Sequence, residues 1–153
     1  MFNQNNLDVK EIIRTFAANI KDMEILKHNY NNTIHFTIMD EINGFEDEVT
    51  NIYVAHTQRP PKWIVDVLNA EPQKQFFYVH SFGTYRRVRN RGYGRKMLQY
   101  IKKYYAGCVL FLEVGSCGEM TNEQLKAFYE SEGFKEILPK EGYVTHYTMA
   151  IEL

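Results

Sequence analysis

One stretch of the sequence decides the fold: residues 84–96, TYRRVRNRGYGRK. It follows a run rich in Phe, Tyr and Val at 75–82 that favours a β-strand. It precedes a segment in which Met97, Ile101 and Tyr104 recur at helical spacing, so the stretch connects a strand to a helix. The unpaired N–H groups and the positive dipole end of a helix start attract anions. The sequence therefore predicts that this loop binds a diphosphate.

The residue types in the loop suit that prediction. Gly92 and Gly94 remove side chains where a phosphate would approach the backbone, and the arginines around them offer charge-assisted hydrogen bonds. A Rossmann dinucleotide site is disfavoured because the three-glycine fingerprint is incomplete. A P-loop is excluded because no Gly-Lys-Ser/Thr ending follows. The alternative is a hairpin-like loop whose arginines are solvated.

The charge distribution also indicates a local anion site. Residues 72–112 carry 9 basic and no acidic side chains, whereas residues 1–71 carry 6 basic and 11 acidic ones and residues 113–153 carry 3 and 8. The formal net charge of the whole chain is only −1. A basic segment between two acidic flanks favours a site for an anion over a generally basic surface.

The remaining pattern predicts one α/β (α+β) domain over residues 1–153, with a mixed sheet and helices on both faces. Apolar residues at helical spacing predict a first helix over 9–20, and a short helical turn is expected at 23–26. Strands are expected at 33–39, 49–56, 75–82, 108–114, 134–138 and 143–153. Further helices are expected from Trp63, from Gly92 and from Thr121, where Gln124 completes a capping box.

Composition excludes several classes of protein. Two cysteines exclude a disulfide scaffold and a four-cysteine zinc site, and no His/Cys spacing predicts a metal. The longest apolar run, 106–112, is far shorter than the roughly 20 residues that cross a bilayer. The polar start is unlike a secretory signal. These features predict a soluble, cytoplasmic protein without a membrane partner.

Three motifs resemble one family. Residues 89–94, RNRGYG, match the Arg/Gln-x-x-Gly-x-Gly/Ala signature of the GNAT N-acetyltransferase superfamily. Residues 112–114, LEV, resemble the strand after the cofactor helix in ribosomal-protein-type acetyltransferases, and Asn122 with 128–134, FYESEGF, resembles motif B. The resemblance covers about 75–138, the expected cofactor-binding core. It implies a GNAT-type central sheet, mixed and mostly antiparallel.

The resemblance also implies a reaction. A GNAT enzyme moves an acetyl group from acetyl-CoA to a primary amine, which attacks the thioester directly in a ternary complex. By resemblance Tyr129 would be the general acid facing the sulfur, and Asn122 would bond the pantetheine arm. Backbone groups of Phe82, Gly83 and Thr84 would also bind the pantetheine. The diphosphate would be held by residues of the loop: Arg89, Asn90, Arg91, Gly92, Tyr93, Gly94 and Arg95.

The catalytic base has two candidates. Glu113 matches the glutamate of the Leu-Glu-Val strand, and it is expected to be a buried carboxylate in an apolar strand. His80 on the preceding strand is a rival, acting through a water. Structural alternatives stay open: Tyr129 as a core aromatic, Asn122 as a helix-start residue, and Glu113 as a solvent-facing or ion-paired residue.

The sequence also departs from the family. The polar and then helical start predicts that the first strand is missing or displaced. Residues 58–72 lengthen a hairpin, and residues 115–120 add length before Asn122. The acidic flanks favour a cationic acceptor, and no other feature of the sequence indicates the identity of the acceptor.

The sequence leaves other functions open. One alternative is a CoA-binding interaction protein without catalysis. Another is a nucleic-acid-binding module, disfavoured because the arginines crowd one loop. A homodimer through an exposed sheet edge is an open prediction.

Overall fold

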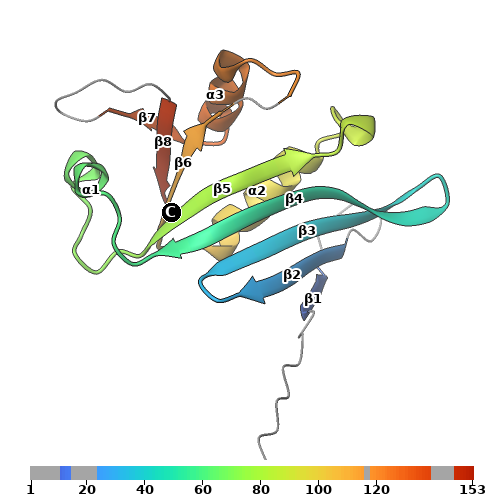
Figure 1. Cartoon of the computed structure of the whole chain (residues 1–153), viewed down its shortest axis with the longest axis horizontal. Coiled ribbons are helices and arrows are strands. Elements are labelled where there is room, and N and C mark those ends of the chain that lie inside the picture. The colour runs from blue at the N-terminus through green and yellow to red at the C-terminus, as the bar shows by residue number, and fades with distance from the viewer. Residues whose placement is uncertain (1–10, 15–23, 116–117, 139–146) are drawn as a thin grey trace, which may run out of the picture.

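A computed structural model of the chain describes residues 11–14, 24–115, 118–138 and 147–153. In this part of the chain one eight-stranded sheet has the order β1-β2-β3-β4-β5-β6-β8-β7 (Figure 1). The strands are β1 Glu11–Arg14, β2 Glu24–Tyr30, β3 Thr33–Ile42, β4 Phe45–Thr57, β5 Phe76–Thr84, β6 Val109–Val114, β7 Lys135–Ile137 and β8 Tyr147–Glu152. The helices are α1 Lys62–Leu68, α2 Tyr93–Tyr104 and α3 Asn122–Ser131, with a 3₁₀ turn η1 at Arg86–Val88.

The pairing confirms the expected mixed, mostly antiparallel sheet. Strands β5 and β6 run parallel, and every other neighbouring pair in the described sheet is antiparallel. The Asn43-Gly44 turn joins β3 to β4 with φ of 54° and 82° at its two residues. Positive φ at both central positions is the backbone that a tight hairpin needs, and Asn-Gly supplies it readily.

The start of the described chain corrects the sequence-based expectation. Residues 11–14 form β1 and residues 24–30 form β2, where a helix over 9–20 and a helical turn at 23–26 were expected. The expectation of a missing first strand is wrong for the same reason. Short apolar runs do not separate helix from strand by spacing alone, and here pairing with β3 over the whole of β2 decides the outcome. The rest of the expected helix lies outside the described residues.

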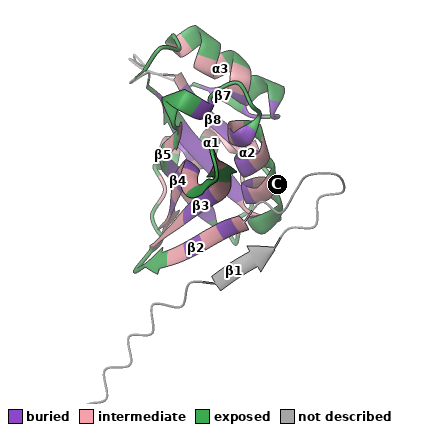
Figure 2. Ribbon diagram, turned by 90° about the vertical axis from the view of Figure 1, so that its right-hand side faces the viewer, coloured by how far each residue is buried: buried purple, intermediate pink, exposed green. Residues whose placement is uncertain are grey.

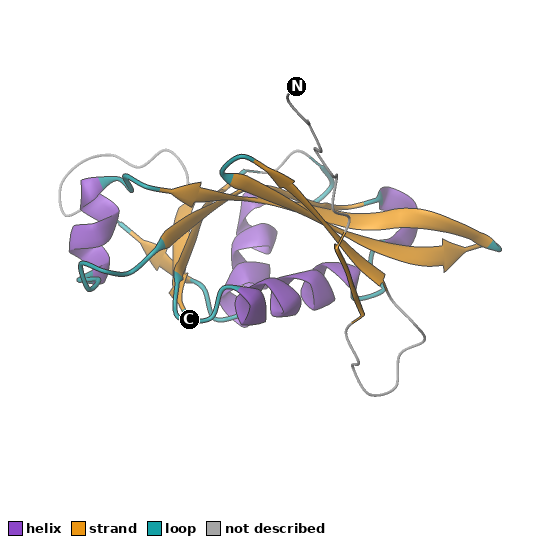
Figure 3. Ribbon diagram, turned by 90° about the horizontal axis from the view of Figure 1, so that it is seen from below, coloured by secondary structure: helices purple, strands orange, loops and turns teal. Residues whose placement is uncertain are grey.

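Helices cover both faces of the sheet, as expected. Helix α2 lies along one face of the sheet, as the edge-on view of the sheet in Figure 3 shows. Met97, Leu98 and Ile101 of this helix are fully buried. They pack in the main core with Phe36 and Ile52 and with other buried strand residues. Figure 2 shows buried segments in the strands and along α2.

A second, smaller core lies on the opposite face under α1. Its members include Ile64 of α1, Phe76 of β5 and Phe111 of β6. The side chains of β5 and β6 therefore alternate between the two cores, as strand geometry requires. We call the face of the sheet opposite α2 the outer face; Tyr53, Tyr78 and Phe111 lie on it.

Candidate active site

The two parallel strands of the sheet separate after a short paired stretch. Strands β5 and β6 pair only from Phe76 with Val109 to Tyr78 with Phe111. Beyond this point β5 continues to Thr84 and β6 to Val114, and Figure 1 shows the two strands diverging. Among the described residues, no strand pairs with the facing edges of these extensions. Backbone N–H and C=O groups seek hydrogen bonds, so this gap can hold an extended polar molecule. The backbone of Phe82, Gly83 and Thr84 borders it.

A β-bulge lies where the gap opens. Tyr53 pairs with Ser81 whereas Val54 pairs with Val79, so His80 is the extra residue of β5. Bulges re-aim side chains and are common beside active sites. The exposed His80 ring lies on the outer face, with its centroid 5.6 Å from that of Tyr53 and 6.2 Å from that of Tyr78.

The predicted anion loop follows β5 directly. Gly92 is the N-cap residue of helix α2 and has a φ of 83°. The helix has no side-chain cap and no acidic residue in its first turn. Gly94 packs on the end of β5, where a Cβ atom would lie 3.5 Å from Thr84 Oγ1 and 3.7 Å from Phe82 Cζ. The uncapped helix start therefore lies against the strand that borders the gap. Such a start suits an anion because its N–H groups and dipole are not balanced by an acidic side chain.

Several arginines of the loop are paired with carboxylates from distant parts of the chain. Arg86 lies 2.8 Å from Glu119, and Arg87 pairs with Asp47 at the far end of the β3–β4 hairpin. The Arg89 Nε donates to the Thr84 carbonyl at 3.0 Å, so this side chain shapes the loop. The carboxylate partners of Arg86 and Arg87 lie 33 and 40 residues away along the chain, and no sequence pattern predicted them.

Two other predicted loop residues direct their side chains into fold contacts. Arg95 pairs with the buried Glu132, which also binds Lys102 at 3.1 Å. The Tyr93 hydroxyl donates to Asp40. Burial, together with this hydrogen bond, raises the pKa of Tyr93. Arg91 and Asn90 are exposed on the loop, and Asn90 has a φ of 61°. The charge and side-chain hydrogen bond of Arg91 act on the pKa of Tyr93 in the opposite direction, so Arg91 lies beside the start of α2, and no carboxylate partner is seen for it among the described residues.

The tyrosine predicted as general acid lies on the same face of the sheet as α2. Tyr129 of α3 is 8% exposed and packs its ring against Phe82 and Phe134 at centroid distances of 6.4 and 5.6 Å. Burial raises its pKa to about 12. Asn122 begins the same helix after the expected capping box of Thr121 and Gln124, in which each side chain accepts from the other's backbone N–H.

Glu113 differs from its expected environment. The residues on either side of it, Leu112 and Val114, are buried, but Glu113 is exposed. Strand alternation turns it to the outer face, where its charge adds to burial in raising the pKa of Tyr78. The expectation of a buried carboxylate is therefore wrong. His80 and Glu113 share the outer face, whereas Tyr129 lies on the α2 side.

Metal-binding groups, membrane-spanning helices and cysteines complete the description of the site. No group of three or more His, Cys, Asp or Glu side chains that could hold a metal occurs within the described ranges. None of the helices seen there is long and apolar enough to cross a membrane. Cys108 is a free thiol, and Cys117 lies outside the described residues.

Comparisons with known proteins agree with this geometry. The model of the Acetyltransferase (GNAT) family matches residues 53–134, more than half of the chain. A structure of Arabidopsis thaliana NAA60 in complex with acetyl-CoA has a TM-score of 0.66 at 15% identity, covering 82% of this chain and 79% of that one. The Bacillus subtilis N-acetyltransferase YlbP in complex with coenzyme A has a TM-score of 0.52 at 10% identity, covering 78% and 67%. At these identities the structures show the shared fold. No curated protein matched the sequence.

Proposed function

We propose that this chain, which belongs to the GNAT acetyltransferase family, is an N-acetyltransferase that moves an acetyl group from acetyl-CoA to a primary amine. One observation carries the proposal: the gap between β5 and β6 opens directly beside the uncapped start of α2. A diphosphate at the helix start and an extended arm along β5 would follow one continuous path. Coenzyme A has that shape, and the solved structures of NAA60 and YlbP are described as complexes with acetyl-CoA and coenzyme A.

The loop and the strand would hold the donor. Backbone N–H groups at the start of α2 and the Arg91 guanidinium would bind the diphosphate. Backbone groups of Phe82, Gly83 and Thr84, with the Asn122 amide, would bind the pantetheine arm. The contacts of Arg95 and Tyr93 favour a supporting part for those side chains, which hold α2 in place.

The acid and the base would act from opposite faces. Tyr129 stays protonated at neutral pH because its pKa is about 12, so it can donate a proton to the departing thiolate. A thiol has an ordinary pKa near 8.5, so this transfer needs close placement of the sulfur against the hydroxyl. His80 at the bulge, or Glu113, would take the proton of an amine that approaches from the outer face. Acid and base then need not compete for one side of the thioester.

The outer face supports a cationic acceptor. It presents the Glu113 carboxylate and the rings of Tyr53 and Tyr78 around His80. Carboxylates and aromatic rings both attract ammonium groups. A polyamine or the lysine side chain of a peptide would satisfy this surface. The homodimer and the cytoplasmic location remain predictions.

Calorimetric titration of acetyl-CoA into the full chain tests the donor. We expect micromolar binding to the native chain and about tenfold weaker binding to Arg91→Ala, because a charge-assisted contact is lost. Arg59→Ala is the matched control: Arg59 is also exposed but lies outside the loop, and its loss should leave binding unchanged. Mass spectrometry of spermidine and a lysine peptide incubated with acetyl-CoA then tests transfer.

The remaining outcomes distinguish the alternatives. Absence of coenzyme A binding, with salt-sensitive binding of an oligonucleotide, would favour the nucleic-acid-binding module. Tight binding of acetyl-CoA without acetylation of any amine would favour the interaction protein that lacks catalysis.

A further inference from the structure

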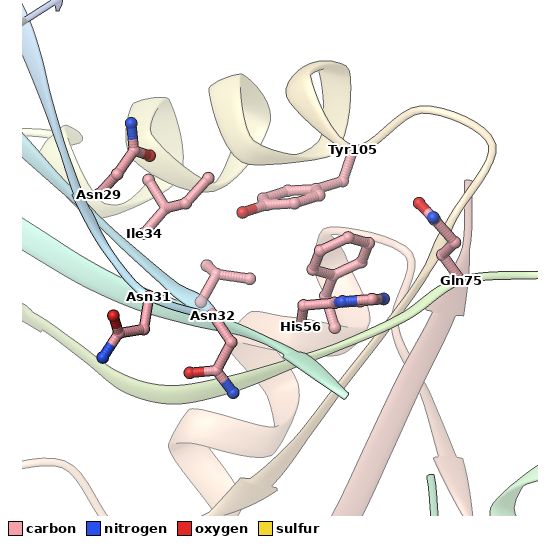
Figure 4. A pocket seen from close by; sticks show the side chains of 9 residues that line it. Asn29, Asn31, Asn32, Ile34, His56, Gln75 and Tyr105 are labelled. Carbon is pink, nitrogen blue, oxygen red and sulfur yellow. The ribbon is translucent and has the colours of Figure 1, made fainter. Parts of the chain in front are cut away.

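A pocket lies at the end of α2 opposite the anion loop. Its volume is about 300 Å³, at the lower limit of ligand pockets in general. It is formed where the β2–β3 turn, the end of β4, the start of β5 and Tyr105, directly after α2, come together (Figure 4). The 12 residues of α2 separate it from the proposed diphosphate site by about 18 Å.

The pocket is lined by a tyrosine hydroxyl that finds no hydrogen-bond partner in the described part of the chain. Tyr105 is 4% exposed, and among the described residues its hydroxyl has no hydrogen-bond partner. Figure 4 shows this hydroxyl pointing away from its helix into the space that the asparagines and His56 border. Buried polar groups are nearly always hydrogen-bonded, and each exception needs an explanation. A ligand that bonds the Tyr105 hydroxyl would provide one.

The described residues at the rim of the pocket carry amides. Asn29, Asn31, Asn32 and Gln75 are exposed and line it, so it offers several donor and acceptor pairs. Among the described residues that line it there is no Lys, Arg, Asp or Glu. A neutral ligand with both donors and acceptors matches this rim, and a phosphorylated ligand would find no cation.

The walls of the pocket are aromatic and apolar. The Phe77 ring lies between those of His56 and Tyr105, with centroid distances of 5.0 and 4.4 Å. Ile34 and the buried Val54 complete the walls. Aromatic walls favour a flat ring, and carboxamides pair with the donor and acceptor edges of nucleobases.

We propose that this pocket binds a neutral nucleobase or nucleoside. The flat ring would lie against Phe77 and His56, its edge would meet the amides of the rim, and one polar atom would bond the Tyr105 hydroxyl. The pocket is separate from the donor site, so both ligands can bind at once.

Titration of adenosine, guanosine, cytidine and uridine into the full chain tests the proposal, with glucose as a neutral ligand that lacks a flat ring. We expect a submillimolar dissociation constant for at least one nucleoside. Tyr105→Phe and Gln75→Ala should each weaken its binding about tenfold, because each removes a hydrogen bond in a partly buried site. Gln73→Ala is the control, since Gln73 is exposed nearby, bonds Glu71 and does not line the pocket.

Two further readouts separate this site from others. Tyr105→Phe keeps the ring and removes only an unpartnered hydroxyl, so its melting temperature should equal or exceed that of the native chain. Saturating acetyl-CoA should leave nucleoside binding intact. The proposal is overturned if no nucleoside binds at millimolar concentration, if glucose binds as tightly, if Tyr105→Phe binds normally, or if acetyl-CoA displaces the nucleoside.

Discussion

Tyr129 illustrates how one position can serve both packing and chemistry. Its ring is part of the main core and contacts Phe128 and Phe134. Both phenylalanines belong to motif B, one before and one after Tyr129. The same burial raises the pKa of its hydroxyl to about 12. A core aromatic and a general acid are therefore compatible readings of this residue, and only a substitution that keeps the ring separates them.

Tyr129→Phe should reduce turnover by about a hundredfold or more, because general acid catalysis contributes factors of that order. Binding of acetyl-CoA should change little, since the ring and its packing are retained. Acetylation rates measured with the best amine from the acceptor screen, beside calorimetric titration of acetyl-CoA, check both expectations. Unchanged turnover would leave Tyr129 with its packing role alone.

At the scale of elements, the start of α2 depends on a backbone conformation that glycine adopts without strain. Gly92 has a φ of 83°, and a Cβ atom there would meet nothing within 4 Å. The cost of a side chain at this position is therefore conformational and not steric. Asparagine tolerates such a φ better than alanine does, as Asn90 with its φ of 61° illustrates two residues earlier.

Gly92→Ala should lower the free energy of unfolding by about 1 kcal/mol, the cost of placing an L-residue in the left-handed region. Gly92→Asn should cost clearly less. Urea unfolding of the three proteins measures both differences. Equal losses in the two variants would show that the left-handed conformation is not the cause.

Helices α2 and α3 are joined by one buried carboxylate. The Glu132 side chain is 4% exposed and binds Arg95 and Lys102, whose side chains are 49% and 24% exposed. The Lys102 ammonium also donates to the Glu132 carbonyl at 2.8 Å. This contact holds the helix that carries Tyr129 against the helix that begins at the anion loop.

Glu132→Gln should lower the free energy of unfolding by about 2 kcal/mol. The loss is smaller than for a fully buried ion pair because both cations reach solvent. Glu130→Gln is the matched control: its pair with Lys126 lies at the surface, where water screens it, so its loss should change the free energy of unfolding far less. Urea unfolding at neutral pH measures both. A loss in the control as large as in Glu132→Gln would contradict a special role for the buried carboxylate.

At the scale of the whole molecule, the main core includes tyrosines that must stay neutral. Burial raises the pKa of Tyr105 and of Tyr129 above the ordinary value of 10, the latter to about 12. A raised folded-state pKa stabilises the fold fully below pH 10, and this contribution is lost as the pH rises toward 12.

The free energy of unfolding should therefore fall between pH 10 and 12, with Tyr129 accounting for about 3 kcal/mol at most. Urea unfolding at pH 8 and pH 11 measures the decrease. Tyr129→Phe should show a smaller decrease than the native chain, whereas Tyr85→Phe, which removes a tyrosine that is 46% exposed, should not. Identical decreases in all three proteins would assign the effect to other groups.

Local patterns were sufficient for much of the fold. The Thr121 capping box and the strand-loop-helix around Gly92 each depend on residues close in sequence, and each formed as predicted. The family signature in the loop and motif B belong to the same class of local pattern, and they sufficed to predict the GNAT fold.

The tertiary structure decided what depends on distant neighbours. Pairing with β3 made β2 a strand, and sheet alternation exposed Glu113. Long-range ion pairs turned Arg87 toward Asp47 and Arg95 toward Glu132, partners that the sequence of the loop does not indicate. The pocket at Tyr105 combines residues from four strands and a helix end, so no local pattern could indicate it. The physical reason is common to all of these: the free energy of a pairing or a burial depends on the partner, and the partner is supplied by the fold.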